Sequence, residues 1–268
     1  AGKYTLNRNM KPSEILEKIH KGDVTLETKT FTFVEGKNVL DLAKVIASTF
    51  SYTEEEVKSV LKNEEFIKKM IEKYDFLTED VLNGNIYYAL EGYLYPDTYE
   101  ILEDASIEEI LVKILDNTKV KLSSLDFSGS NYSMHDILTM ASIVELEGSN
   151  ADDRAKFAQV IYKRLELGMT LGMDTTAKYV AQMEGKNVNY SVMSPYNTRR
   201  VDVGMAGKLP VGPIGNPSLA AVDAVLHPSD TDYIYFVANT CTGENFFNVD
   251  LMEHSKKARE LKEICATN

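Results

Sequence analysis

A helix that carries a carboxylate on its apolar side is predicted by SMHDILTMASIVELEG, residues 133–148. Ser133 and Asp136 have the spacing of a capping box, and Gly148 suits the position where the chain leaves a helix. At about 100° per residue, one stripe of this helix collects Met134, Ile137, Leu138, Ala141, Val144 and Glu145.

Glu145 lies near the middle of this stripe, where a carboxylate is costly unless it is protonated, paired or lining a cleft. The alternative is a helix end that rises to the surface just before Gly148, which would leave Glu145 in water. Periodicity alone favours neither interpretation. Glu147 points well away from the stripe and is expected to be solvated.

The composition excludes several classes of protein. A chain of 268 residues can form one large domain or two modest ones, each with its own core. The net charge of −12 argues against a nucleic-acid partner, because such binding needs clustered Lys and Arg facing phosphates. No apolar run approaches the roughly 20 residues that a membrane helix needs.

The cysteines and histidines indicate no metal centre. Cys241 and Cys265 show no metal-binding spacing, so two unrelated thiols are expected, with a disulfide open as the alternative in an exported protein. The four histidines are scattered singly, which argues against a zinc site. Neither a metal nor an organic cofactor is expected.

The N-terminal part is predicted to be a small module. Residues 1–23 are expected to form a short strand and a small helix, and residues 24–34 alternate like a strand or hairpin arm. Asn38 and Thr53 then begin two helices, each with an acidic residue three positions later.

A loop rich in tyrosine follows at residues 86–99, where five tyrosines, a glycine, a proline and two carboxylates gather in fourteen residues. Such loops often line a binding cleft, and a rigid structural loop stays equally open.

The C-terminal half mixes helices and a hairpin. Its predicted elements are helices at 106–121, 152–167 and 250–264, a constrained loop at 209–215, and strands at 233–238 and 246–249.

Six motifs occur in the order found in one family. They are Glu91–Tyr99, Ala141–Glu145, Met173–Thr176, Tyr196–Thr198, Leu209–Ile214 and Tyr233–Val237. Over residues 84–255 the chain resembles the YceG-like (MltG) endolytic murein transglycosylases, and its N-terminal part more faintly resembles their LysM-like subdomain. The resemblance implies an α+β fold with an N-terminal region at 1–82, including a LysM-like module at about 24–75. A catalytic domain at 83–268 would have a helical core and a strand-rich C-terminal region.

The same resemblance implies a lyase on the outer face of the cytoplasmic membrane, anchored by a helix upstream of residue 1. It would cut nascent peptidoglycan strands internally at the β-1,4 bond between N-acetylmuramic acid and N-acetylglucosamine, leaving 1,6-anhydro ends. Its partners would be glycan strands and synthases of the elongation machinery. The catalytic glutamate of the family corresponds to Glu145.

One glutamate suffices for this reaction, because the muramic acid 6-hydroxyl replaces the second carboxylate of a glycosidase. Glu145 would protonate the leaving oxygen and then take the proton of that hydroxyl. Protonation before the first step is favoured by burial, so an apolar setting is expected around Glu145.

Other residues of the motifs are candidates for supporting roles. Asn197, beside Tyr196, would bind an acetamido group or hold Glu145, with a turn cap as the alternative. Tyr93 and Tyr95 would stack on sugars or pack in the core. The remaining candidates, each with a purely structural alternative, are Glu91, Glu147, Asp174, Thr175, Pro210, Gly212 and Pro213.

Two departures from the family pattern concern sugar contacts: Arg199 stands where many relatives have Tyr, and residues 244–247 replace an aromatic or His-containing stretch.

Two other functions stay open. A muramidase-type hydrolase would need a second carboxylate such as Glu91, Glu147 or Asp174 across the cleft. A noncatalytic peptidoglycan-binding scaffold would need none.

Overall fold

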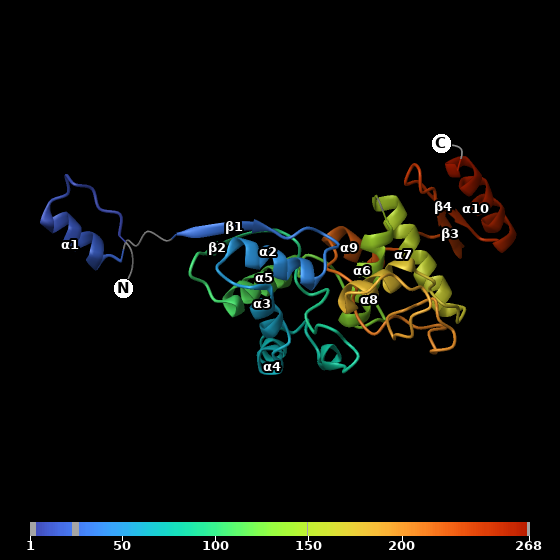
Figure 1. The fold of residues 1–268 in the computed structure, drawn as a ribbon, viewed down its shortest axis with the longest axis horizontal. Coiled ribbons are helices and arrows are strands. Elements are labelled where there is room, and N and C mark those ends of the chain that lie inside the picture. The colour runs from blue at the N-terminus through green and yellow to red at the C-terminus, as the bar shows by residue number, and fades with distance from the viewer. Residues whose placement is uncertain (1–3, 23–26, 149, 267–268) are drawn as a thin grey trace.

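The computed structural model describes residues 4–22, 27–148 and 150–266, in which helices alternate with short strands (Figure 1). The helices are α1 (Pro12–His20), α2 (Val39–Thr49), α3 (Glu54–Leu61), α4 (Glu64–Lys73), the 3-10 helix η1 (Glu79–Leu82), α5 (Ile107–Leu122), α6 (Met134–Glu147), α7 (Ala151–Glu166), α8 (Asp174–Glu184), α9 (Leu219–Leu226) and α10 (Leu251–Ala266). The strands are β1 (Thr28–Thr32), β2 (Thr98–Leu102), β3 (Tyr235–Ala238) and β4 (Asn245–Asn248). The α+β prediction is confirmed.

Helix α6 lies at the centre of the larger helical cluster, packed against α7, α8 and α9 (Figure 1). Its capping box is present, since the Ser133 hydroxyl accepts a hydrogen bond from the Asp136 N–H at 3.1 Å. His135 and every residue from Ile137 to Val144 are buried, so the predicted single stripe was too narrow. A helix enclosed on all sides carries no polar face over most of its length.

Strands β1 and β2 form an antiparallel pair in which Phe31 lies opposite Tyr99, and the two rings are 5.5 Å apart. This ladder joins residues on both sides of the predicted division between residues 82 and 83. The division itself stays a prediction.

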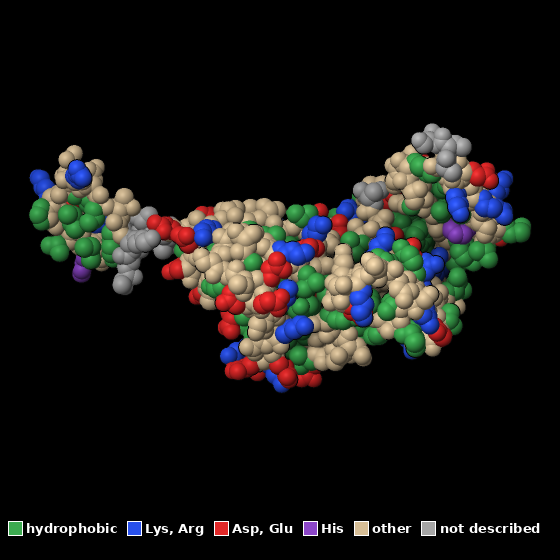
Figure 2. Space-filling view, in the orientation of Figure 1, with side chains coloured by type: hydrophobic (Ala, Val, Ile, Leu, Met, Phe, Trp, Pro, Cys, Tyr) green, Lys and Arg blue, Asp and Glu red, His purple; other side chains and the backbone are tan. Residues whose placement is uncertain are grey.

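Several local predictions are confirmed by the described residues. Helices begin after Asn38 and Thr53 as expected, and both side chains accept hydrogen bonds from N–H groups of the first turn. Figure 2 shows acidic and basic side chains interspersed over α3 and α4, as i to i+4 pairs such as Glu64 with Lys68 require. The strand expected before α1 is absent from residues 4–22, and residues 1–3 lie outside the described residues.

The expectation of a strand-rich C-terminal region is wrong. Between residue 103 and residue 266, the described strands are β3 and β4, which form one antiparallel hairpin as predicted. Helices α8 and α9 lie in the same range and are not among the predicted elements.

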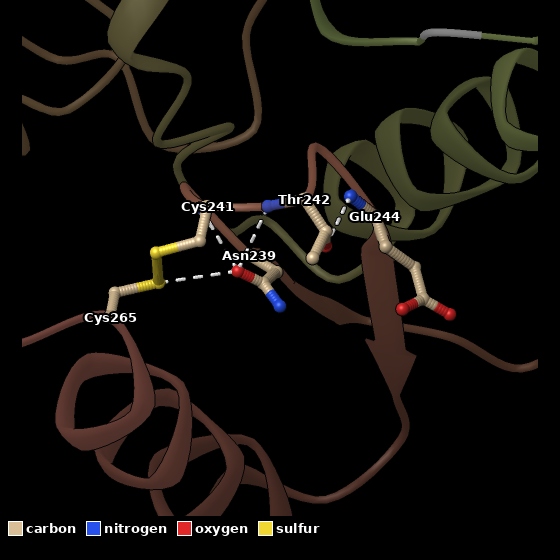
Figure 3. The surroundings of a disulfide bond; sticks show 5 residues. All are labelled: Asn239, Cys241, Thr242, Glu244 and Cys265. Atoms are coloured by element: carbon tan, nitrogen blue, oxygen red, sulfur yellow. Dashed lines mark hydrogen bonds between the residues drawn. A yellow bond between two sulfur atoms is a disulfide. The ribbon is translucent and has the colours of Figure 1, made fainter. Parts of the chain in front are cut away.

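A disulfide joins Cys241, in the turn between β3 and β4, to Cys265 near the end of α10 (Figure 3). The expectation of two unrelated thiols is therefore wrong. The side-chain oxygen of Asn239 orders the same turn, because it accepts hydrogen bonds from the N–H groups of Cys241 and Thr242. Among the helices that the structure describes, none has the length and apolarity to cross a membrane.

Candidate functional site

Glu145 lies in the last turn of α6 with its carboxylate paired. Its side chain is 7% exposed, and the Arg154 guanidinium lies 2.9 Å from Oε1. The Ser218 N–H donates to Oε2 at 3.0 Å, and the Ser218 hydroxyl donates to the same oxygen. A helix end that leaves this carboxylate in water is therefore wrong, and the expected apolar setting is replaced by a cation and two hydrogen-bond donors.

The partners of Glu145 come from two different helix starts. Arg154 stands in the first turn of α7, where the N–H of Asp153 is capped by Asn150. Ser218 is the N-cap of α9, and its hydroxyl accepts from the Ala221 N–H at 3.2 Å while it donates to Glu145. The Ser218 hydroxyl thus caps α9 and also binds the Glu145 carboxylate.

The loop before α2 packs against the end of α6. Gly36 has φ +71, and a Cβ there would lie 3.5 Å from Glu145 Cγ. Its N–H donates to the carbonyl of Asn216 at 2.9 Å, and the Asn216 N–H donates to the carbonyl of Lys37 at the same distance. The N-terminal region therefore reaches the neighbourhood of the candidate site.

Glu91 is 1% exposed and lies within a buried polar network. It accepts hydrogen bonds from the Val39 N–H at 3.2 Å, the Tyr179 hydroxyl at 3.2 Å and the Asn216 side-chain amide at 2.9 Å. Burial raises the pKa of Glu91 to about 8, against the opposing effect of these hydrogen bonds. With every neighbour in place, this carboxyl has no free surface for a sugar.

Glu147 is not the solvated residue that was expected. It accepts a hydrogen bond from the Thr175 hydroxyl at 2.8 Å, and burial raises its pKa, with the Thr175 bond acting in the opposite direction. Asp174 begins α8 and forms an ion pair with Arg199. This chain's departure from the family pattern, Arg199, thus has a carboxylate partner.

The Tyr196 and Asn197 side chains are both buried. The Tyr196 ring stacks on Tyr87 at 5.4 Å. The Asn197 amide donates to the carbonyls of Tyr190 and Val192, at 3.0 and 2.9 Å. These bonds hold the 190–199 loop together, as the turn-cap alternative describes, and a role of Asn197 in substrate binding stays a prediction.

The tyrosines of the 86–99 loop are buried or half-buried. Tyr93 is buried, and its hydroxyl lies 2.8 Å from His135 Nδ1. Tyr95 is half-buried, with the Lys121 ammonium 5.0 Å from its ring centre. Packing accounts for Tyr93, whereas stacking of Tyr95 on a sugar stays a prediction.

The constrained loop at 209–215 packs against α6 and the 86–99 loop. Pro210, Gly212 and Pro213 are all buried. A Cβ at Gly92, where φ is +85, would come within 2.4 Å of the Pro213 side chain. The Ile214 N–H donates to the Ser142 hydroxyl of α6 at 3.0 Å. The end of this loop at Ile214 therefore has a structural role, since it is bonded to α6.

Sequence reasoning missed the residues that contact Glu145 directly. Ser218 had a usable signal, since it precedes an apolar run as an N-cap does. Arg154 had none, because its role depends on how separate segments meet, and the same holds for Asn216, which bonds Glu91 rather than Glu145.

The fold and this site define an α+β protein built around a central helix with a paired glutamate, and comparison with known proteins identifies its relatives. The YceG-like family model matches residues 1–260. The chain belongs to the YceG-like family.

Two curated relatives carry the name endolytic murein transglycosylase. The one from Bacillus subtilis (strain 168) is 36% identical over 263 residues, covering 96% of this chain and 71% of the relative. The one from Streptococcus pneumoniae serotype 2 (strain D39) is 29% identical over 281 residues, covering 97% of this chain and 50% of the relative. A crystal structure of a YceG-like protein from Listeria monocytogenes superposes with a TM-score of 0.78 at 34% identity, covering 94% and 83% of the two chains.

Proposed function

We propose that this protein is an endolytic murein transglycosylase, a lyase that cuts the β-1,4 bond between N-acetylmuramic acid and N-acetylglucosamine and leaves 1,6-anhydro ends. The names of the Bacillus and Streptococcus relatives support this function. The observation that carries it is the position of Glu145, which ends the Ala141–Glu145 motif of the family resemblance and has a distinct partner on each carboxylate oxygen.

In the proposed reaction Glu145 acts twice. The protonated form of Glu145 gives its proton to the glycosidic oxygen as the bond from that oxygen to the anomeric carbon breaks. The 6-hydroxyl oxygen of the muramic acid then bonds to the anomeric carbon, and its proton passes to the Glu145 carboxylate. Glu145 ends in its starting state, and no water is consumed.

The surroundings of the other carboxylates argue against a hydrolase with two acidic residues. Glu91 is enclosed by its hydrogen-bond donors, Glu147 is bonded to Thr175, and Asp174 is paired with Arg199. A hydrolase would need one of them to hold a water or attack the sugar across a cleft. Burial excludes Glu91 from that role, and Asp174, whose side chain is 47% exposed, is the carboxylate that a hydrolase would use.

The setting of the enzyme is part of the same proposal. A disulfide between Cys241 and Cys265 suits an oxidising compartment, which supports a place on the outer face of the cytoplasmic membrane. The family resemblance leads us to propose three further features. They are an anchor helix upstream of residue 1, a LysM-like module that binds glycan, and contact with peptidoglycan synthases.

Digestion of purified peptidoglycan followed by mass spectrometry tests the function. We expect anhydro ends from the wild-type protein and a loss of about 10²- to 10⁴-fold in rate for Glu145→Gln. Glu65→Gln on α4, where the side chain is 81% exposed, is the matched control and should keep full activity. Reducing ends would indicate a hydrolase, and no cleavage would indicate a scaffold protein.

A further inference from the structure

The segment from Ile214 to Ser218 connects Glu145 to a buried network that includes the N-terminal region. At one end, the Ile214 N–H is bonded to Ser142 of α6. At the other end, Ser218 supplies both donors to Glu145 Oε2. Whatever fixes the middle of this short segment therefore also fixes the orientation of the carboxylate.

Asn216 holds the middle of the segment and is fully buried. Its side-chain oxygen accepts hydrogen bonds from the N–H groups of Gly92 and Leu94, both at 3.0 Å. Its amide nitrogen donates to the Lys37 carbonyl at 3.0 Å and to Glu91 at 2.9 Å. The side chain thus makes four hydrogen bonds, which satisfies its full capacity.

Glu91 extends the network to the start of α2, where both of its oxygens lie 3.2 to 3.3 Å from the Val39 nitrogen. With Tyr179 of α8, Asn216 and Glu91 join four segments that are far apart in the sequence. Buried polar networks with every group satisfied favour one arrangement over its alternatives, because any shift leaves an unpaired group in the interior.

We propose that Glu91 and Asn216 are positioning residues for the reaction and act through Ser218, which holds Glu145 in the orientation for proton transfer. The inference rests on the proposed function of Glu145. Neither residue touches the glycan. A displacement of about 1 Å at a reacting group can cost about 10²-fold in rate. Glu91 and Asn216 can therefore control kcat without touching the substrate.

Kinetics of anhydro-product release by variants of the full chain test this inference. We expect Glu91→Ala to lower kcat about 10- to 100-fold with KM changed by less than about threefold. Glu91→Gln keeps an oxygen that accepts from Asn216, and its amide N–H can donate to the Tyr179 hydroxyl oxygen. We expect the kcat of this variant to stay within about threefold of wild type.

A double-mutant cycle with Ser218→Ala shows whether the effect passes through Ser218. We expect Glu91→Ala to lower kcat by less than about threefold when Ser218 is already Ala. Equal fold-changes in both backgrounds would overturn the inference, as would a change confined to KM. If Glu91→Ala does not fold, Asn216→Asp, which keeps the side-chain shape and faces Glu91 with an oxygen, replaces it in the same cycle.

Tyr74→Phe is the control for general destabilisation. Tyr74, the residue that follows α4, is buried, and its hydroxyl donates to Asp116 of α5 at 2.7 Å. We expect this variant to lower the melting temperature and keep kcat. Wild-type protein that releases no anhydro product contradicts the proposed function, whereas normal wild-type activity with independent effects in the cycle contradicts only the positioning role.

Discussion

The guanidinium of Arg154 lies 2.9 Å from the Glu145 carboxylate, and this ion pair joins the last turn of α6 to the first turn of α7. The chain is closely packed at Gly148, directly after α6. A Cβ at Gly148 would lie 2.6 Å from Arg154 Cγ, so the side chain that pairs with Glu145 also fills the space beside this glycine. The packing at Gly148 and the position of the charge are therefore coupled.

Arg154→Met should destabilise the protein by about 2 kcal/mol, because it leaves the Glu145 carboxylate, 7% exposed, without its cation. Removing one partner of a fully buried pair costs about 3–5 kcal/mol, and partial exposure of Arg154, at 18%, reduces this figure. Urea denaturation measures the change. Lys163→Met, which removes a more exposed pair with Glu166, should cost less than about 1 kcal/mol. Equal losses in the two variants would contradict the prediction.

Gly92→Ala should cost more than about 3 kcal/mol, since it adds a clash to an unfavourable backbone conformation. With φ at +85, any side chain is strained there, and the new Cβ would meet Pro213 at 2.4 Å. Gly168→Ala is the matched control, because Gly168 has φ +65 and open space around its Cβ position. We expect it to lose only about 1 kcal/mol. Denaturation curves that give both variants the same stability would refute the steric explanation.

Sequence periodicity and capping patterns predicted the features whose partners are near in sequence. Ser133 reaches its capping partner three residues later, and the β3–β4 hairpin closes over a short turn. Several of the failures are features with distant partners. Strand β2 pairs with a strand 66 or more residues earlier, and Ser218 reaches Glu145 across 73 residues. No local sequence pattern encodes a contact between segments so far apart. The position of the Glu145 carboxylate could therefore be predicted, and its contacts with Ser218 and Arg154 could not.

Stability should depend on pH through Glu91. Burial raises the pKa of Glu91 in the folded protein to about 8, from the ordinary value of 4.5, so between these values the folded state binds a proton that the unfolded state has released. The free energy of unfolding therefore falls as pH rises, by about 1 kcal/mol per pH unit and by about 3 kcal/mol from pH 5 to pH 8.

Glu91→Gln isolates this contribution, because glutamine does not titrate and keeps the shape of the side chain. The difference in unfolding free energy between wild type and the variant should shift in favour of the variant across the same pH range. Urea denaturation at several pH values measures it. Parallel curves for the two proteins would show that Glu91 keeps one protonation state throughout.

The disulfide between Cys241 and Cys265 should stabilise the hairpin and α10, because it closes a loop with a sequence separation of 24 residues. Closing a loop of this length removes about 3 kcal/mol of chain entropy from the unfolded state. We expect Cys265→Ser to lower the free energy of unfolding by up to about that amount and to make the protein insensitive to reductant. Peptide mapping under non-reducing conditions checks the bond, and denaturation with and without dithiothreitol checks its effect. A wild-type protein whose stability is unchanged by reductant, despite a mapped bond, would show that α10 is held by packing rather than by the covalent link.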